Sequence, residues 1–169
     1  MSRMIHNADQ FIVIGENIHA TRVVKRGGVR GHVYEDGTEA VKYKVGGDQR
    51  FVTVPEHFIG TQPYEQGNLK HFMIAMWQGL NGTSDESAQG KDYIRYEVDR
   101  QINAGSHYLD LNVDESSYRL HEQKQTMEWV VKFVESVSAV PPSVDSSNVE
   151  IIEVGLSAYG GSQGRPMLN

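Results

Sequence analysis

The sequence predicts an α/β fold with a parallel sheet, because short apolar strands alternate with amphipathic helices. From residue 91 onward, a predicted helix is followed by a predicted strand three times in succession. Strands separated by helices pair in parallel through right-handed crossovers. The expected strands are short and apolar, as in sheets that are covered on both faces. A chain of 169 residues is expected to form one domain.

The first expected strand and the long stretch after it differ in character. Residues 11–15, FIVIG, form an apolar, β-branched run that predicts a buried strand. Residues 20–90 carry most of the glycines and show few clear periodicities. We interpret them as an excursion, an insertion or a cap outside the repeating units. Within it, residues 31–45 contain an Asp-Gly pair typical of hairpin turns, and residues 71–80 indicate a short helix.

Residues 91–169 are expected to form regular βα units. Apolar residues recur at spacings of three and four in the segments between the strands, which predicts amphipathic helices. The expected helices are 91–105, 122–138 and 149–159, and the expected strands are 106–113, 141–146 and 165–169. Ser147 and Glu150 match a capping box that would start the last helix.

Composition excludes several classes of protein. The net charge of −6 disfavours general affinity for nucleic acid or anionic membranes. There is no cysteine, and none of the seven histidines forms an HxH or HExxH spacing, so no metal site is expected. No segment approaches the roughly 20 apolar residues that a membrane span needs. The N-terminus does not resemble a secretory signal, so we expect a cytoplasmic protein.

Each expected strand ends in polar residues. These are Glu16 and Asn17, Asp110 and Asn112, Asp145 and Ser146, and Asn169. The carboxyl ends of parallel strands are where α/β folds bind ligands. Carboxylates and carboxamides suit a flat, nitrogen-rich heterocycle, whereas a phosphate would need backbone N–H groups and arginines. Individually, these residues can also be turn formers, helix-start carboxylates or loop polars, and His19 can either line the mouth or be a solvated loop histidine.

Four motifs carry a resemblance to a known family. VIGENIH, AGSHYLDLNVD, PPSVDSSNVEIIEVGL and GRPMLN occur in the order seen in the pterin-binding (β/α)8 barrels. The resemblance covers about residues 11–19 and 91–169 and implies the N-terminal part of a TIM barrel. Among these barrels, the four motifs are most similar to those of the methyltetrahydrofolate:corrinoid methyltransferases. Dihydropteroate synthases typically have a glycine-rich stretch where this chain has LNVDESSY.

The resemblance implies a role for each strand-end residue. Asp145 and Asn169 would bind the pterin, Asp110 and Asn112 would line the same cavity, and Glu16 and Asn17 would belong to the first-strand part of the site. Ser146 follows the pterin-binding aspartate and is included in the expected site. The family usually has asparagine where this chain has His19.

The implied reaction is methyl transfer in one-carbon metabolism. A methyl group would pass from N5 of tetrahydrofolate or a related pterin to a corrinoid (cobalamin) held by a partner protein or domain. Because a tertiary amine is a poor leaving group, the reaction needs protonation or hydrogen bonding at N5. In the family this help comes from later strands, so catalytic residues are expected beyond Asn169.

The end of the sequence leaves several interpretations. A complete barrel has about 250 residues, and we expect this chain to be a fragment that is inactive alone. One alternative is a condensation enzyme like dihydropteroate synthase. Another is a non-catalytic pterin-binding subunit completed by a partner, and a homodimer is also left open.

Overall fold

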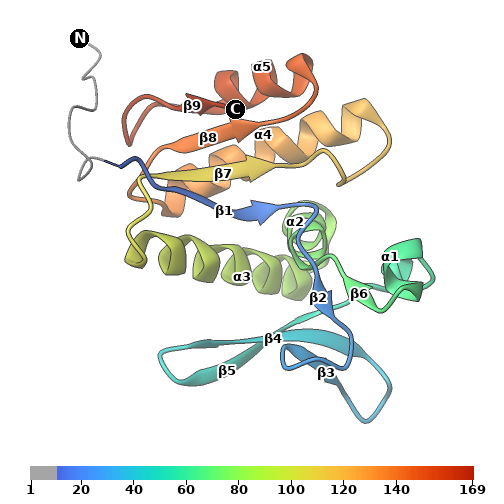
Figure 1. Cartoon of the computed structure of the whole chain (residues 1–169). Coiled ribbons are helices and arrows are strands. Elements are labelled where there is room, and N and C mark those ends of the chain that lie inside the picture. Colours follow the sequence, from blue (N-terminus) through green and yellow to red (C-terminus); the bar gives the residue numbers. More distant parts are fainter. Residues whose placement is uncertain (1–10) are drawn as a thin grey trace.

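The main sheet of the protein is parallel, as the sequence predicts. The computed structural model describes residues 11–169 (Figure 1). Its four-stranded sheet has the order β1-β7-β8-β9, and each neighbouring pair is parallel. The strands are β1 (Ile14–His19), β7 (Tyr108–Asn112), β8 (Pro142–Asp145) and β9 (Met167–Leu168). Because strand order follows chain order, successive right-handed crossovers place all connecting helices on one side.

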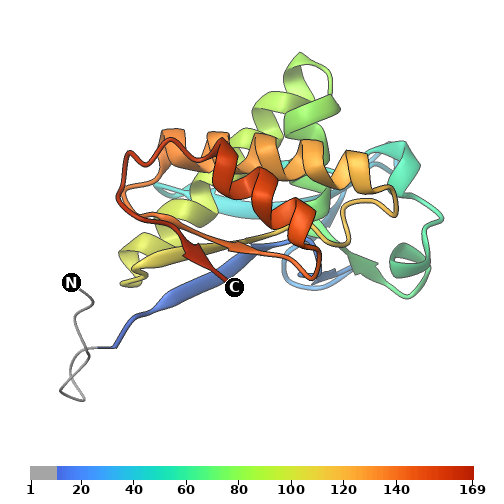
Figure 2. The same ribbon diagram turned by 90° about the horizontal axis from the view of Figure 1, so that it is seen from above.

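The helices that connect these strands cover a single face of the sheet (Figure 2). They are α3 (Ser84–Asn103), α4 (Leu120–Val137) and α5 (Val149–Ala158). Val144 of β8 points toward them, since a Cβ added at Gly155 of α5 would lie 2.6 Å from its Cγ1. Side chains alternate along a strand, so Asp145 points to the opposite face. Helices outside and polar side chains inside are the arrangement of part of a TIM barrel.

The excursion forms a second, smaller structure beside α3. Its elements are β2 (Val24–Lys25), β3 (Gly31–Val33), β4 (Glu39–Val45), β5 (Asp48–Thr53), η1 (Glu56–Phe58), α1 (Gln62–Glu65), β6 (Asn68–Leu69) and α2 (His71–Asn81). The predicted hairpin is confirmed as β3 and β4, and β5 adds a third antiparallel strand. The expected short helix is confirmed as α2. Helix α3 lies between this small sheet and the main sheet (Figure 1), and Tyr43 of β4 packs edge-on against Tyr93 of α3.

The first strand lies further along the chain than its apolar run predicts. Phe11, Ile12 and Val13 are 72%, 55% and 43% exposed, and β1 extends through His19. Pairing with β7 explains the shift, because regular register begins only at Ile14. Tertiary pairing therefore overrides the local β-propensity of FIVIG.

Two helix starts also differ from expectation. Helix α3 begins at Ser84 instead of residue 91, where Thr83 and Glu86 form a reciprocal capping box. The capping box predicted for α5 is wrong. The side chain of Asn148 is the cap and accepts a hydrogen bond from the Glu150 N–H at 2.9 Å. Instead of reaching back to the helix start, the Glu150 carboxylate pairs with Lys124.

Within residues 11–169, no helix combines the length and the apolarity needed to cross a bilayer.

Candidate functional site

Polar side chains from three strands form one row across the end of the main sheet. In the register of the sheet, His19 of β1 pairs with Asn112 of β7, and Asn112 pairs with Asp145 of β8. The Asn169 N–H donates to the Val144 carbonyl at 3.1 Å, which places Asn169, directly after β9, next to Asp145. The carboxyl ends of the strands thus bring together residues that are far apart in the sequence.

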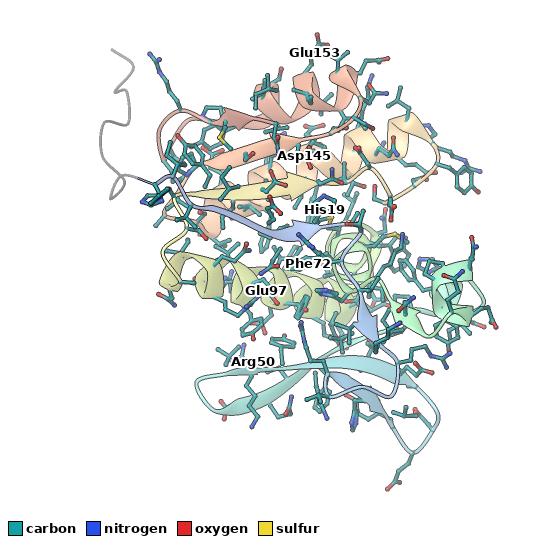
Figure 3. All side chains as sticks on the ribbon, in the orientation of Figure 1. His19, Arg50, Phe72, Glu97, Asp145 and Glu153 are labelled. Atoms are coloured by element: carbon teal, nitrogen blue, oxygen red, sulfur yellow. The ribbon has the colours of Figure 1, made fainter. Side chains whose placement is uncertain are left out.

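Asp145 is oriented by its neighbours in this row. The Asn112 Nδ2 donates to Asp145 Oδ2 at 2.8 Å, and His19 Nε2 lies 3.5 Å from the same oxygen. Asn112 is itself fixed, because its Oδ1 accepts from the Asp114 N–H at 3.1 Å. Figure 3 labels His19 and Asp145, which lie on either side of β7. Within residues 11–169 no group donates to Asp145 Oδ1, so this oxygen is free to accept from a ligand.

The tautomer of His19 follows from its own hydrogen bonds. The Thr21 hydroxyl lies 2.7 Å from Nδ1, and the Thr21 N–H donates to the same atom at 3.3 Å. Because Nδ1 accepts, the ring proton lies on Nε2, which faces Asp145. The His19 side chain is 19% exposed and belongs to β1. His19 therefore lines the site, and the alternative of a solvated loop histidine is wrong.

Asp110 lies one row deeper, on the same face of β7. It is 2% exposed, and its register partner Ser143 on β8 is fully buried. Neither Asp110 Oδ1 nor the Ser143 hydroxyl has a hydrogen-bond partner among the described residues. Burial raises the pKa of the Asp110 carboxyl and the nearby charge of Asp145 adds to this, although the neighbouring side chains of Ser143 and Asn169 lower the pKa in part. Buried polar groups normally have partners, so these two atoms are candidates for contact with a bound group.

Asp114, in the loop after β7, is a structural residue beside the row and was not predicted from the sequence. Its carboxylate accepts hydrogen bonds from the Ser146 hydroxyl and, at 2.8 Å, from the Ser147 N–H. Burial alone would raise the pKa of Asp114, but these hydrogen bonds outweigh burial and lower it. Ser146 was expected in the binding site. Its hydroxyl instead links the loop after β8 to the loop after β7. The signal was present, since Asp114 is the third polar residue of the DLNVD motif.

Glu16 and Asn17 do not join the row. They lie inside β1, where the register with β7 shifts between Gly15 and Ile18. The exposed carboxylate of Glu16 pairs with Arg22 at 3.4 Å, and the Asn17 N–H donates to Gln101 on α3 at 3.1 Å. The expectation that these residues end the first strand at the mouth is wrong, because the strand continues to His19.

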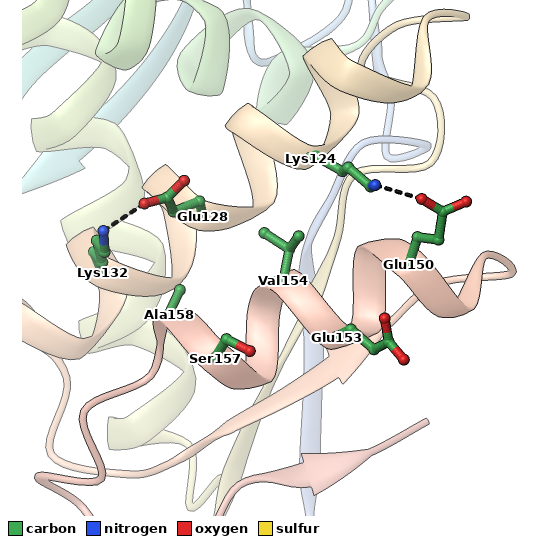
Figure 4. Close-up of a pocket in the computed structure, with 8 residues that line it drawn as sticks. All are labelled: Lys124, Glu128, Lys132, Glu150, Glu153, Val154, Ser157 and Ala158. Carbon is green, nitrogen blue, oxygen red and sulfur yellow. Dashed lines mark hydrogen bonds and ion pairs between the residues drawn. The ribbon is translucent and has the colours of Figure 1, made fainter.

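One surface hollow adjoins this row, and another lies on the helical side of the sheet. One of about 610 Å³ lies between the excursion and the loop after β7, and its lining includes His57, Trp77, Asp114 and Tyr118. It adjoins the row through Asp114. Another, of about 400 Å³, lies between α4 and α5 on the helical side of the sheet (Figure 4). Two ion pairs lie along that groove, Lys124 with Glu150 and Lys132 with Glu128.

Fold and site together define a class of protein: part of an α/β barrel that holds a ligand at its strand ends with carboxylates and carboxamides. The family described as pterin binding enzyme matches residues 80–169, which is more than half of the chain. The chain therefore belongs to the pterin-binding enzymes, a family that includes dihydropteroate synthases and methyltetrahydrofolate methyltransferases. No match was found among curated proteins.

Proposed function

We propose that the row His19, Asn112 and Asp145, with Asp110 beneath it and Asn169 beside it, binds a reduced pterin of the methyltetrahydrofolate type. Membership of the pterin-binding family supports this assignment. The polar groups are those expected for a neutral heterocycle. Their carboxylates accept from ring N–H groups, and their carboxamides both accept and donate.

The observation that carries the proposal is the geometry of Asp145. Its Oδ2 is oriented by Asn112 and His19, whereas Oδ1 has no donor in residues 11–169. A carboxylate has about four lone-pair positions, so Asp145 can still accept from the 2-amino group and from N3–H of a pterin. Orientation before binding lowers the cost of ordering the site.

The acidic character of the site disfavours anionic ligands. Asp110 and Asp145 lie in the site, and Asp114 and Glu115 lie in the loop after β7 that lines the adjoining hollow. Phosphate groups would be repelled by this set, which includes no arginine. A ring that donates hydrogen bonds is the better complement.

With the ring held by Asp145, N5 and its methyl group would face the open mouth. Methyl transfer from N5 to a corrinoid carried by another protein or domain is then the reaction we propose, following the resemblance to the corrinoid methyltransferases. The row of His19, Asn112 and Asp145, together with Asp110 and Asn169, would bind and orient the pterin. The groups that assist N5 are not assigned to residues of this chain.

The excursion is proposed to cap one side of this mouth. Residues 20–90 contribute His57, Phe58, Met73 and Trp77 to the hollow next to Asp114. A ligand held by its pterin ring at Asp145 can extend its remaining part toward this wall. This proposal assigns a role to a region that the family resemblance does not cover.

A condensation enzyme like dihydropteroate synthase is the alternative within the same family. The two candidates differ in the ligand they must hold, so affinity distinguishes them without catalysis. We expect 5-methyltetrahydrofolate to bind more tightly than dihydropteroate when both are titrated calorimetrically into the full chain. A clear preference for dihydropteroate would favour the condensation enzyme, and binding of neither compound would count against the pterin site itself.

A further inference from the structure

Three side chains of types that can bind a metal lie close together in the site, although the sequence shows no metal motif. His19 Nε2 and one oxygen each of Asp110 and Asp145 all lie within 4.8 Å of one another. The three residues come from β1, β7 and β8, so no short sequence spacing could reveal them. The sheet register brings them together.

A second observation points to a positively charged ligand. Asp110 is 2% exposed, and its Oδ1 has no hydrogen-bond partner among the described residues. A buried carboxylate oxygen without a hydrogen-bond partner carries a desolvation cost unless a cation or a donor compensates it. Asp145 is a second carboxylate beside it, so the need for compensation is greater than for one acid alone.

The Thr21 hydroxyl beside the His19 ring can support that ring in a metal-binding orientation. Metal-binding histidines usually donate their other ring N–H to a neighbouring acceptor, which fixes their orientation. Here the Thr21 hydroxyl lies 2.7 Å from Nδ1. A cation at Nε2 requires the other tautomer, in which Nδ1 carries the proton and donates it to the Thr21 oxygen.

We propose that His19 Nε2 and the carboxylates of Asp110 and Asp145 bind one divalent transition-metal ion when no pterin is present. One imidazole and two carboxylates suit Zn²⁺, which takes such ligands at about 2.0–2.2 Å and accepts three protein ligands plus an open position. Ligand atoms around Zn²⁺ are at most roughly 4 Å apart, so small side-chain rotations close the site. His19 is decisive, because the asparagine usual in the family offers no imidazole.

Pterin and metal would exclude each other, because both need Asp145. This second part rests on the proposed function, whereas metal binding by itself does not. A metal-loaded site would be unable to accept the ring N–H groups. The ion would then act as a competitive inhibitor of pterin binding.

The test titrates ZnCl₂ calorimetrically into the EDTA-treated full chain without pterin, with the visible absorption of Co²⁺ as a second readout. We expect one ion per chain. Loss of a group that only orients a ligand weakens binding roughly 10- to 100-fold, so His19→Asn should weaken it by at least that much. Asp110→Asn is the second variant. His121→Asn is the matched control, because that side chain is 71% exposed on α4, and circular dichroism confirms folding of each variant.

Absence of saturable binding, or equal affinity in the His19→Asn and His121→Asn variants, would overturn the metal site. Pterin titrations in EDTA keep the two proposals separate. Pterin binding without zinc binding would refute only the metal site, and zinc binding without pterin binding would refute only the proposed function. Simultaneous binding of zinc and pterin would refute their mutual exclusion.

Discussion

At the scale of single residues, the two oxygens of Asp145 have different surroundings. One oxygen accepts from Asn112 and faces the His19 ring, and the other has no donor within residues 11–169. The protein therefore sets the orientation of the carboxylate before any ligand arrives. The sequence predicted Asp145, Asn112, Asp110 and Asn169 for this site, because polar residues after apolar parallel strands gather at one edge.

Two residue-level features could not be predicted from the sequence. The place of His19 depends on the bulge in β1, which only the pairing with β7 reveals. The role of Asp114 depends on two loops that lie side by side in space. Glu16 was misplaced for the related reason that the end of β1 was expected four residues too early, at Gly15 instead of His19.

A buried histidine of the excursion gives a prediction on pH dependence. His71 is 5% exposed, and burial, together with nearby arginines, lowers its pKa from 6.5 to about 3. As the pH falls below 6.5, the unfolded chain binds a proton that the folded chain does not bind. The free energy of unfolding therefore falls, by on the order of 3–5 kcal/mol from this group once pH 3 is reached.

The measurement is urea unfolding of the wild type and of His71→Gln between pH 7 and pH 4. Glutamine can still hydrogen-bond Tyr93, the present partner of His71 at 2.7 Å, but it does not titrate. We expect the variant to lose stability less steeply on acidification than the wild type. The exposed-site control His121→Gln should follow the wild type, and parallel curves for all three proteins would contradict the assigned pKa.

At the scale of elements, the helices and strands after residue 91 were largely predictable because their apolar periodicity is regular. Boundaries failed where capping or pairing decides them. The start of α3 was missed although Thr83 and Glu86 have capping-box spacing. Strand β5 was missed although two glycines with positive φ, Gly46 and Gly47, mark the turn before it.

The cap of α5 provides a prediction that separates the sequence expectation from the structure. Asn148→Ala removes the oxygen that accepts from the Glu150 N–H and should lower the free energy of unfolding by about 1 kcal/mol. Ser147→Ala should cost less, because this variant keeps the backbone N–H that donates to Asp114 at 2.8 Å. Chemical denaturation of both variants is the measurement. A larger loss for Ser147→Ala would restore the capping box predicted from the sequence.

At the scale of the whole molecule, α3, α4 and α5 cover one face of the main sheet (Figure 2). The polar side chains of the row project from the other face. This separation is what a barrel architecture requires, with packing outside and chemistry at the strand ends. The alternating pattern of the sequence was sufficient to predict it. The packing of the excursion beside α3 was not predictable, since its short strands contact elements remote in the sequence.

The central claim is that this chain holds a pterin through Asp145, and calorimetric titration with 5-methyltetrahydrofolate in the presence of EDTA tests it most directly. Asp145→Asn keeps the shape of the side chain but removes its charge. A hydrogen bond to a charged group contributes about 1.5–3 kcal/mol, so we expect affinity to fall roughly 10- to 100-fold. Asp99→Asn, at an exposed position on α3, should bind as the wild type does. Equal affinity in all three proteins would contradict the account.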